Sequence, residues 1–182
     1  YFFYNYQVSG VSQFKKYPYD KYRLASQWLL DNSNDGDVVF NADWSDFPQL
    51  FFWNSKNHYI IGMDPMSLYL KDKERYWLWR NISGSGMVCS KKVCEGDERS
   101  MYEVIKNDFN SKYVFINNYK IKKNNSYFEM SSGANDGFAW NTQGKKNIFE
   151  DLVGVLDRDE RFELVYRDAS FPEIMIYRLK GE

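Results

Sequence analysis

The residue types best suited to chemistry gather in one short stretch, Asp43-Trp44-Ser45-Asp46-Phe47. It comes two residues after Val38-Val39-Phe40, an apolar run that predicts a short buried strand. Open α/β sheets bind ligands at the carboxyl ends of their strands, where this stretch would lie. Its two carboxylates could coordinate a hard cation, orient a hydroxyl, or accept hydrogen bonds from a peptide or sugar. The alternative, which the residue types favour, is helix capping, in which Asp43 or Ser45 binds first-turn amides and Asp46 interacts with the positive helix end.

Further candidates lie around the next apolar run, His58-Tyr59-Ile60-Ile61. Asp64-Pro65 has the same ambiguity between a binding site and a helix cap, with capping favoured. Trp53 could stack on a sugar face, although aromatic side chains mostly pack in cores. His58 is the only histidine, so any Ser-His-Asp triad would have to use it, and a structural role is favoured. The complete set expected to bind substrate is Asp43, Trp44, Asp46, Phe47, Trp53 and Asp64.

Cys89 and Cys94 are the only two cysteines of the chain. They are close enough in sequence for a local disulfide loop, and they supply too few ligands for a closed zinc site. A disulfide would place the chain outside the cytosol, whereas two reduced, buried thiols would remove that inference. The sequence leaves both alternatives open.

The composition describes an aromatic-rich and nearly neutral globular protein. Aromatic residues make up 19% of the 182 residues, and the formal net charge is -1. Lys and Arg are scattered among acidic residues, so nothing favours a nucleic-acid partner. The sequence contains no GxSxG, GxxxxGK[ST] or GxGxxG motif, which argues against the hydrolases and nucleotide-binding proteins that carry them.

The periodicity of apolar residues predicts alternating helices and strands. Helices are expected over 19–32, from a Ser45 cap through Leu50-Phe51-Phe52 with Pro48 in the first turn, from Asp64-Pro65 onward, over 71–82, over 100–109 and over 146–157. Strands are expected at 38–40, 58–62, 112–117, 162–167 and 173–179, the last two forming an antiparallel hairpin. Residues 118–144 have the composition of a long excursion with one hairpin around 127–130. We therefore expect an α/β fold with a single mixed sheet, in which short parallel strands carry helices on both faces and a C-terminal hairpin closes one edge.

Five of the first six residues are aromatic, so the start of the chain differs in composition from the rest. Tyr1-Phe2-Phe3-Tyr4-Asn5-Tyr6 has the composition found where a chain leaves a membrane, although a buried strand would look similar. We expect residues 1–18 to be a membrane-proximal linker and residues 19–182 to be a single domain. No window of the sequence approaches the roughly 20 apolar residues that cross a bilayer.

Three segments resemble a known family. Tyr22-Arg23-Leu24-Ala25-Ser26-Gln27-Trp28-Leu29-Leu30-Asp31-Asn32, then Gly36-Asp37-Val38-Val39-Phe40 and Trp44-Ser45-Asp46-Phe47, resemble polytopic membrane glycosyltransferases of the GT-C type. The resemblance is to the region where the chain leaves its last transmembrane helix and enters an extracytoplasmic domain. The C-terminal hairpin also looks like the end of such domains.

Within that group, two comparisons differ in their fit. Trp44, Asp46 and Phe47 are similar to positions of the WWDYG motif, which holds the acceptor sequon in the oligosaccharyltransferase catalytic subunit. Ser45 replaces its second Trp and Pro48 its Gly, so sequon recognition is not carried over. The better fit is to bacterial membrane proteins similar to dolichyl-phosphate-mannose protein mannosyltransferases.

The resemblance implies a domain on the extracytoplasmic side of the cell membrane that is not itself catalytic. It would cover an active site in its own transmembrane domain, which uses a lipid-phosphate-linked sugar donor, and contribute to binding a glycan or protein acceptor. No cofactor is expected in this fragment, and a divalent cation would belong to the full-length enzyme. One alternative is a carbohydrate- or protein-binding module without an enzymatic parent. Another, less favoured, is a hydrolase built on Asp43, Asp46 and Asp64.

Overall fold

The computed structural model describes residues 18–92, 99–118 and 152–181. The strands are β1 (Val38–Asn41), β2 (His58–Tyr59), β3 (Ser111–Asn117), β4 (Phe162–Arg167) and β5 (Ile174–Leu179). The helices are α2 (Arg23–Asn32), α3 (Phe47–Trp53), α4 (Met66–Lys71), α5 (Lys73–Ser85), α6 (Met101–Glu103) and α7 (Leu152–Arg158). A 3₁₀ turn, η1 (Trp44–Asp46), precedes α3, and a π-helical turn, η2 (Val104–Asp108), extends α6.

The strands form one open mixed sheet in the order β2-β1-β3-β5-β4. Strand β1 pairs in parallel with β2 on one side and with β3 on the other. Strand β5 is antiparallel to both β3 and β4. The predicted α/β fold with a C-terminal antiparallel pair is therefore confirmed.

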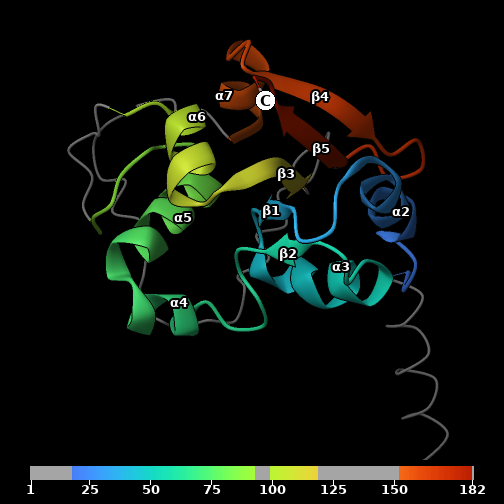
Figure 1. The fold of residues 1–182 in the computed structure, drawn as a ribbon, viewed down its shortest axis with the longest axis horizontal. Coiled ribbons are helices and arrows are strands. Elements are labelled where there is room, and N and C mark those ends of the chain that lie inside the picture. Colours follow the sequence, from blue (N-terminus) through green and yellow to red (C-terminus); the bar gives the residue numbers. More distant parts are fainter. Residues whose placement is uncertain (1–17, 93–98, 119–151, 182) are drawn as a thin grey trace, which may run out of the picture.

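Alternate side chains of each strand enter two different cores. Val39, Phe115 and Ile176 face the layer of α2 and α3, with Ala25, Leu29 and Leu50. Phe40, Val114 and Met175 face the layer of α5, α6 and α7, with Trp79, Ile82, Val104 and Leu156. Figure 1 shows the sheet between these two groups of helices. Because a strand alternates its side chains across the sheet, strands buried on both faces need near-continuous apolar sequence, as 112–117 has.

Several helix boundaries differ from the prediction because local capping decided them. Helix α2 begins at Arg23, after a turn that contains Tyr19, rather than at Tyr19. Asp43 accepts a hydrogen bond from the amide of Ser45 at 2.8 Å, so Asp43 rather than Ser45 caps the 3₁₀ turn. Asp72 interrupts the apolar pattern and caps α5, separating it from α4.

Several predictions fall on residues outside the described ranges. They are the linker at 1–18 except for Pro18, the excursion over 118–144 except for Asn118, and the predicted helix before Leu152. In the part of the chain that the structure describes, no helix is both long enough and apolar enough to span a bilayer.

Candidate functional site

The carboxyl end of β1 is organised by a fully buried asparagine, Asn41. Its side-chain amide donates to the carbonyl of Ile61 at 2.9 Å and to that of Asp43 at 3.3 Å, while its oxygen accepts from the amide of Ile61 at 3.1 Å. Trp79 of α5 donates its indole N–H to the backbone carbonyl of Asn41 at 3.0 Å. Asn41 thus continues the parallel pairing beyond the two residues of β2 and fixes the loop that carries Asp43.

Asp46 lies at the centre of a buried polar cluster. It is 1% exposed, and its Oδ1 accepts a hydrogen bond from the hydroxyl of Tyr22 at 2.5 Å and from the amide of Asn117 at 3.2 Å. Asn117 also donates to the Tyr22 hydroxyl. The second oxygen, Oδ2, is buried and has no hydrogen-bond partner among the described residues. One carboxylate therefore joins the start of α2, the turn before α3 and the end of β3.

This environment changes the acidity of Asp46. Burial raises its pKa from 3.8 to about 7, because a carboxylate loses its hydration in the protein interior. The hydrogen bond from Tyr22 opposes this rise, the charge of Asp43 adds to it, and Asn117 and Lys21 oppose it. Asp46 can therefore gain or lose a proton near neutral pH, which is a property of general acids and bases as well as of buried structural carboxyls.

A second buried carboxylate lies beside this cluster. Lys21 donates to the side-chain oxygen of Asn117 at 3.0 Å, and its ammonium lies 3.4 Å from Oε1 of Glu173. Glu173, just before β5, is 1% exposed, and the Lys21 side chain is 12% exposed. We call Lys21, Tyr22, Asp46, Asn117 and Glu173 the carboxyl-edge cluster.

The carboxyl-edge cluster lies at the point where the order of the parallel strands reverses. From β1 the chain goes to β2 on one side, and it then crosses back to β3 on the other side. Ligand crevices of open α/β sheets form beyond the carboxyl ends of the strands at such a reversal. Asp46 follows β1 and Asn117 ends β3, so their hydrogen bond marks this position.

The predicted site residues divide between this edge and neighbouring surfaces. Asp43, Trp44 and Asp46 share one turn, in which Asp43 is half-buried and Trp44 is 47% exposed. Phe47 is half-buried, with its ring 5.4 Å from that of Phe51. Trp53, at the other end of α3, donates its indole N–H to the carbonyl of Tyr19 at 3.4 Å.

Asp64 lies at the start of α4 and acts there as a capping residue. Its carboxylate accepts from the amide of Met66 at 2.8 Å, and its carbonyl accepts from the hydroxyl of Ser67 at 2.8 Å. The side chain of Asp64 is exposed. These bonds agree with the capping interpretation, which the sequence favoured for Asp64.

Cys89 is disulfide-bonded, and Cys94, the other cysteine of the chain, lies outside the described residues. The segment that carries Cys89 is held by Asn81 of α5. The buried side-chain amide of Asn81 donates to the carbonyls of Cys89 and Lys91 at 2.8 and 2.9 Å. This bond pattern anchors the disulfide-bonded segment to α5.

A hollow of about 460 Å³ lies at the opposite ends of the strands, beside the start of β3 and the end of β5. It is lined by Asn34, Asp37, Lys112, Tyr113, Arg178, Leu179, Lys180 and Gly181. Two of its cations are in ion pairs, Lys112 with Asp37 at 3.3 Å and Arg178 with Glu163 at 2.6 Å. None of the lining residues belongs to the carboxyl-edge cluster, so the hollow is separate from it.

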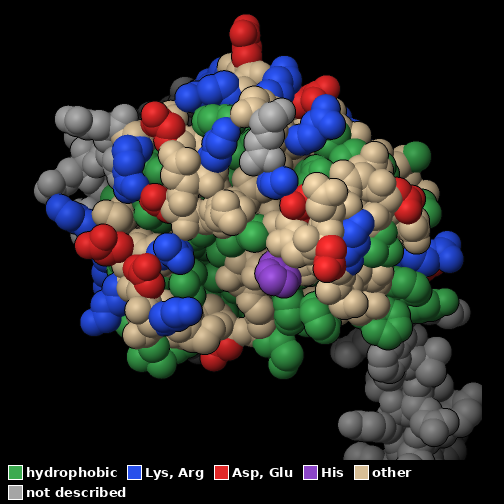
Figure 2. Space-filling model, viewed as in Figure 1, with side chains coloured by type: hydrophobic (Ala, Val, Ile, Leu, Met, Phe, Trp, Pro, Cys, Tyr) green, Lys and Arg blue, Asp and Glu red, His purple; other side chains and the backbone are tan. Residues whose placement is uncertain are grey.

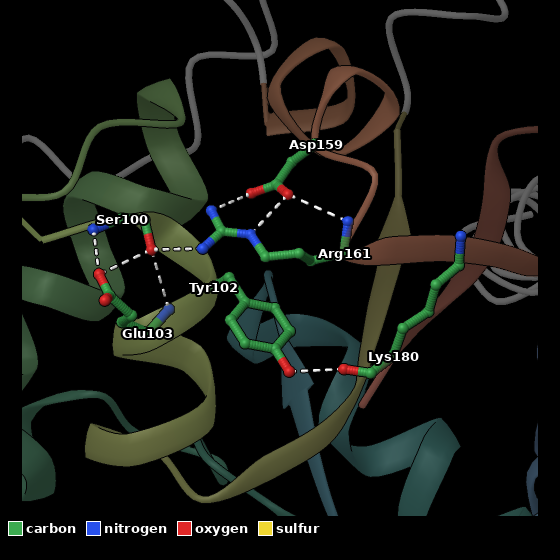
Figure 3. A network of polar contacts seen from close by, with 6 residues as sticks. All are labelled: Ser100, Tyr102, Glu103, Asp159, Arg161 and Lys180. Carbon is green, nitrogen blue, oxygen red and sulfur yellow. Dashed lines mark hydrogen bonds and ion pairs between the residues drawn. The ribbon is translucent and has the colours of Figure 1, made fainter. Parts of the chain in front are cut away.

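A polar network near those strand ends joins α6 to the ends of β4 and β5 (Figure 3). Ser100 and Glu103 form a capping box at the start of α6. Arg161 binds the carboxylate of Asp159 through two nitrogens at 2.8 and 2.7 Å and reaches the Ser100 hydroxyl at 3.2 Å. The hydroxyl of Tyr102 donates to the carbonyl of Lys180 at 2.5 Å. Every group drawn has a capping or bridging role, so the network is structural.

The Arg161 side chain is about half exposed, so its contribution to stability should be small. Arg161→Ala is expected to lower the free energy of unfolding by roughly 0.5–1 kcal/mol, and Arg161→Lys by less, because lysine keeps the charge but loses the two-nitrogen contact. Urea denaturation measures both. Equal losses in the two variants would show that the guanidinium geometry contributes nothing.

The sequence analysis missed four members of the carboxyl-edge cluster, and it also missed Asn41 at the end of β1. Asn117 had a usable signal, since it is a polar residue at the end of an apolar predicted strand, as Asn41 is. Tyr22 looked like part of the apolar stripe of a helix. Lys21 and Glu173 carried no pattern, because they meet only through tertiary structure.

In the described part of the chain, no group of three or more His, Cys, Asp or Glu side chains is arranged to hold a metal ion. Comparison of the chain with models of protein families, with curated proteins and with solved structures finds no match.

Proposed function

We propose that this chain is an extracytoplasmic domain of a membrane-embedded glycosyltransferase that uses a lipid-phosphate-linked sugar. The domain covers the membrane active site and contributes to binding a glycan or protein acceptor, without itself being catalytic. The support is the resemblance of residues 22–47 to such enzymes, together with the disulfide-bonded state of Cys89, which is typical of proteins outside the cytosol.

The observation that carries the binding role is the arrangement at the carboxyl ends of β1 and β3. Trp44 exposes about half of its surface there, next to half-buried Asp43 and in the same turn as the buried Asp46. An exposed indole can stack on the apolar face of a sugar ring, and a neighbouring carboxylate can accept hydrogen bonds from sugar hydroxyls. Asp46 is too buried to touch a ligand in this conformation, so its role is to hold the turn that presents Trp44.

Titration with glycans and acceptor peptides, followed by NMR, tests this role. Trp44→Ala should weaken binding at least tenfold, because it removes the stacking surface and leaves the buried cluster intact. Phe52→Ala is the matched control, since Phe52 is an exposed aromatic residue on the last turn of α3. Binding that is unchanged in Trp44→Ala and in Asp46→Ala would remove this surface from the proposal.

The sequence encoded ahead of Tyr1 tests the parent enzyme separately. Several hydrophobic spans there would support a membrane glycosyltransferase. If that sequence contains none, the alternative of a binding module without an enzymatic parent is favoured.

A further inference from the structure

Exposed apolar side chains gather on α3, on α4 and on the segment between β2 and α4. Phe52 is 75% exposed, Met63 72% and Leu70 76%, while Phe51 and Met66 are 49% and 52% exposed. Figure 2 shows hydrophobic side chains at the surface over these elements, along the lower part of the view. We call Phe51, Phe52, Met63, Met66 and Leu70 the α3–α4 apolar face.

Packed aromatic side chains join the α3 part of this face to the segment that carries Met63. Phe51 stacks on Phe47, whose ring is 5.9 Å from that of Tyr59 on β2. The Phe47 ring also lies against Gly62, directly before Met63. On α4, Met66 and Leu70 are one helical turn apart and so share a side of the helix. Phe51 and the segment before Met63 are thus held by packed aromatic rings, and helix α4 holds Met66 and Leu70.

The described chain begins beside this face. Tyr19 is 78% exposed, and its carbonyl accepts the hydrogen bond from Trp53, next to Phe52 on α3. In Figure 1 the first described residues lie next to α3. The 17 residues that join there begin with the aromatic sequence 1–6, whose composition is typical of the membrane interface.

We propose that the α3–α4 apolar face docks onto the surface of a lipid bilayer, with Phe52, Met63 and Leu70 inserted among the lipids. This inference rests on the proposed function and identifies the side of the domain that faces the membrane. Single protruding Phe, Met and Leu side chains suit a fluid apolar medium, which needs no matching hollows. Acidic and basic residues flank α4 together, as in Lys71-Asp72-Lys73-Glu74-Arg75, so anionic lipid should add little to binding.

Co-sedimentation of the 182-residue chain with vesicles of phosphatidylcholine, with and without phosphatidylglycerol, tests this. The chain should bind both vesicle types with similar affinity, and a Phe52→Ser/Leu70→Ser double variant should bind at least tenfold more weakly. Leu164→Ser is the matched control, because Leu164 is 40% exposed on strand β4, away from this face. An unchanged melting temperature would show that the variants remain folded.

Three results would overturn the docking proposal. The first is wild-type protein that does not sediment with vesicles. The second is an equal loss of vesicle binding in Leu164→Ser and in the double variant. The third is concentration-dependent self-association of the wild type that the double variant abolishes and Leu164→Ser does not. The last would assign the face to a second copy of the chain. Glycan titration is read without vesicles, so loss of vesicle binding with retained glycan binding would reject this surface and keep the proposed function.

Discussion

Asp46→Asn should remove a decrease in stability that Asp46 causes between about pH 4 and pH 7. Burial raises the pKa of Asp46 from 3.8 to about 7, so the folded protein holds a proton that the unfolded chain releases across this range. The contribution of Asp46 to the free energy of unfolding therefore falls as pH rises from about 4 to about 7. At about 1.4 kcal/mol per pKa unit, the full difference corresponds to roughly 4 kcal/mol.

Asparagine has nearly the same shape and keeps an oxygen that can accept from Tyr22 and Asn117, but it does not ionise in this range. We expect the variant to gain stability relative to the wild type as pH rises, with the gain complete just above pH 7. Urea denaturation at a series of pH values measures the difference between the two proteins. Acidic groups with lowered pKa, such as Asp159, are common to both and cancel.

Asp64→Asn is the matched control for this experiment. It makes the same chemical change at an exposed cap, where asparagine can still accept the amide of Met66. Its stability should follow the wild-type pH profile. Parallel profiles for the wild type and Asp46→Asn would contradict the assignment of the buried proton to Asp46.

Asn41→Ala should lower the free energy of unfolding by about 3 kcal/mol. The substitution leaves the amide and carbonyl of Ile61 without their side-chain partner in a part of the protein that is closed to water. Each buried polar group left unsatisfied costs about 1–3 kcal/mol. The indole of Trp79 would keep its bond, because it goes to the backbone carbonyl of residue 41.

Denaturation gives the size of this loss, and hydrogen exchange gives its location. Exchange should accelerate at the amide of Ile61, whose hydrogen-bond acceptor is removed. The matched control is Asn32→Ala at an exposed helix end, which should change stability by less than about 0.5 kcal/mol. A loss at Asn41 no greater than that at Asn32 would show that Asn41 does not hold the two parallel segments together.

The order of helices and strands could be predicted from the sequence because it depends on local patterns. The apolar residues within 112–117 predicted a strand, and β3 is that strand. Likewise, the alternating sequences at 162–167 and 173–179 became the antiparallel pair β4 and β5. Boundaries were less accurate where a single capping residue decided them, as Asp43 and Asp72 did.

The candidate site could be predicted only in part. Its position after β1 followed from a general property of α/β sheets, and Asp43, Trp44 and Asp46 were found in that way. The sequence favoured capping over a binding role for this turn, and the structure shows both a cap at Asp43 and a buried carboxyl at Asp46. Burial of one acidic residue beside an exposed neighbour has no signature in residue type or spacing.

The sequence by itself determined the fold class and the edge of the sheet where polar groups collect, since both follow from periodicity along the chain. Only the tertiary structure decided that Tyr22, Asp46 and Asn117 meet, because these residues are separated by 24 to 95 positions. It also decided the acidity of Asp46, since a pKa depends on hydration and on neighbouring charges in space. Loss of hydration is a property of the packed chain, which converts an ordinary aspartate into a carboxyl that titrates near neutral pH.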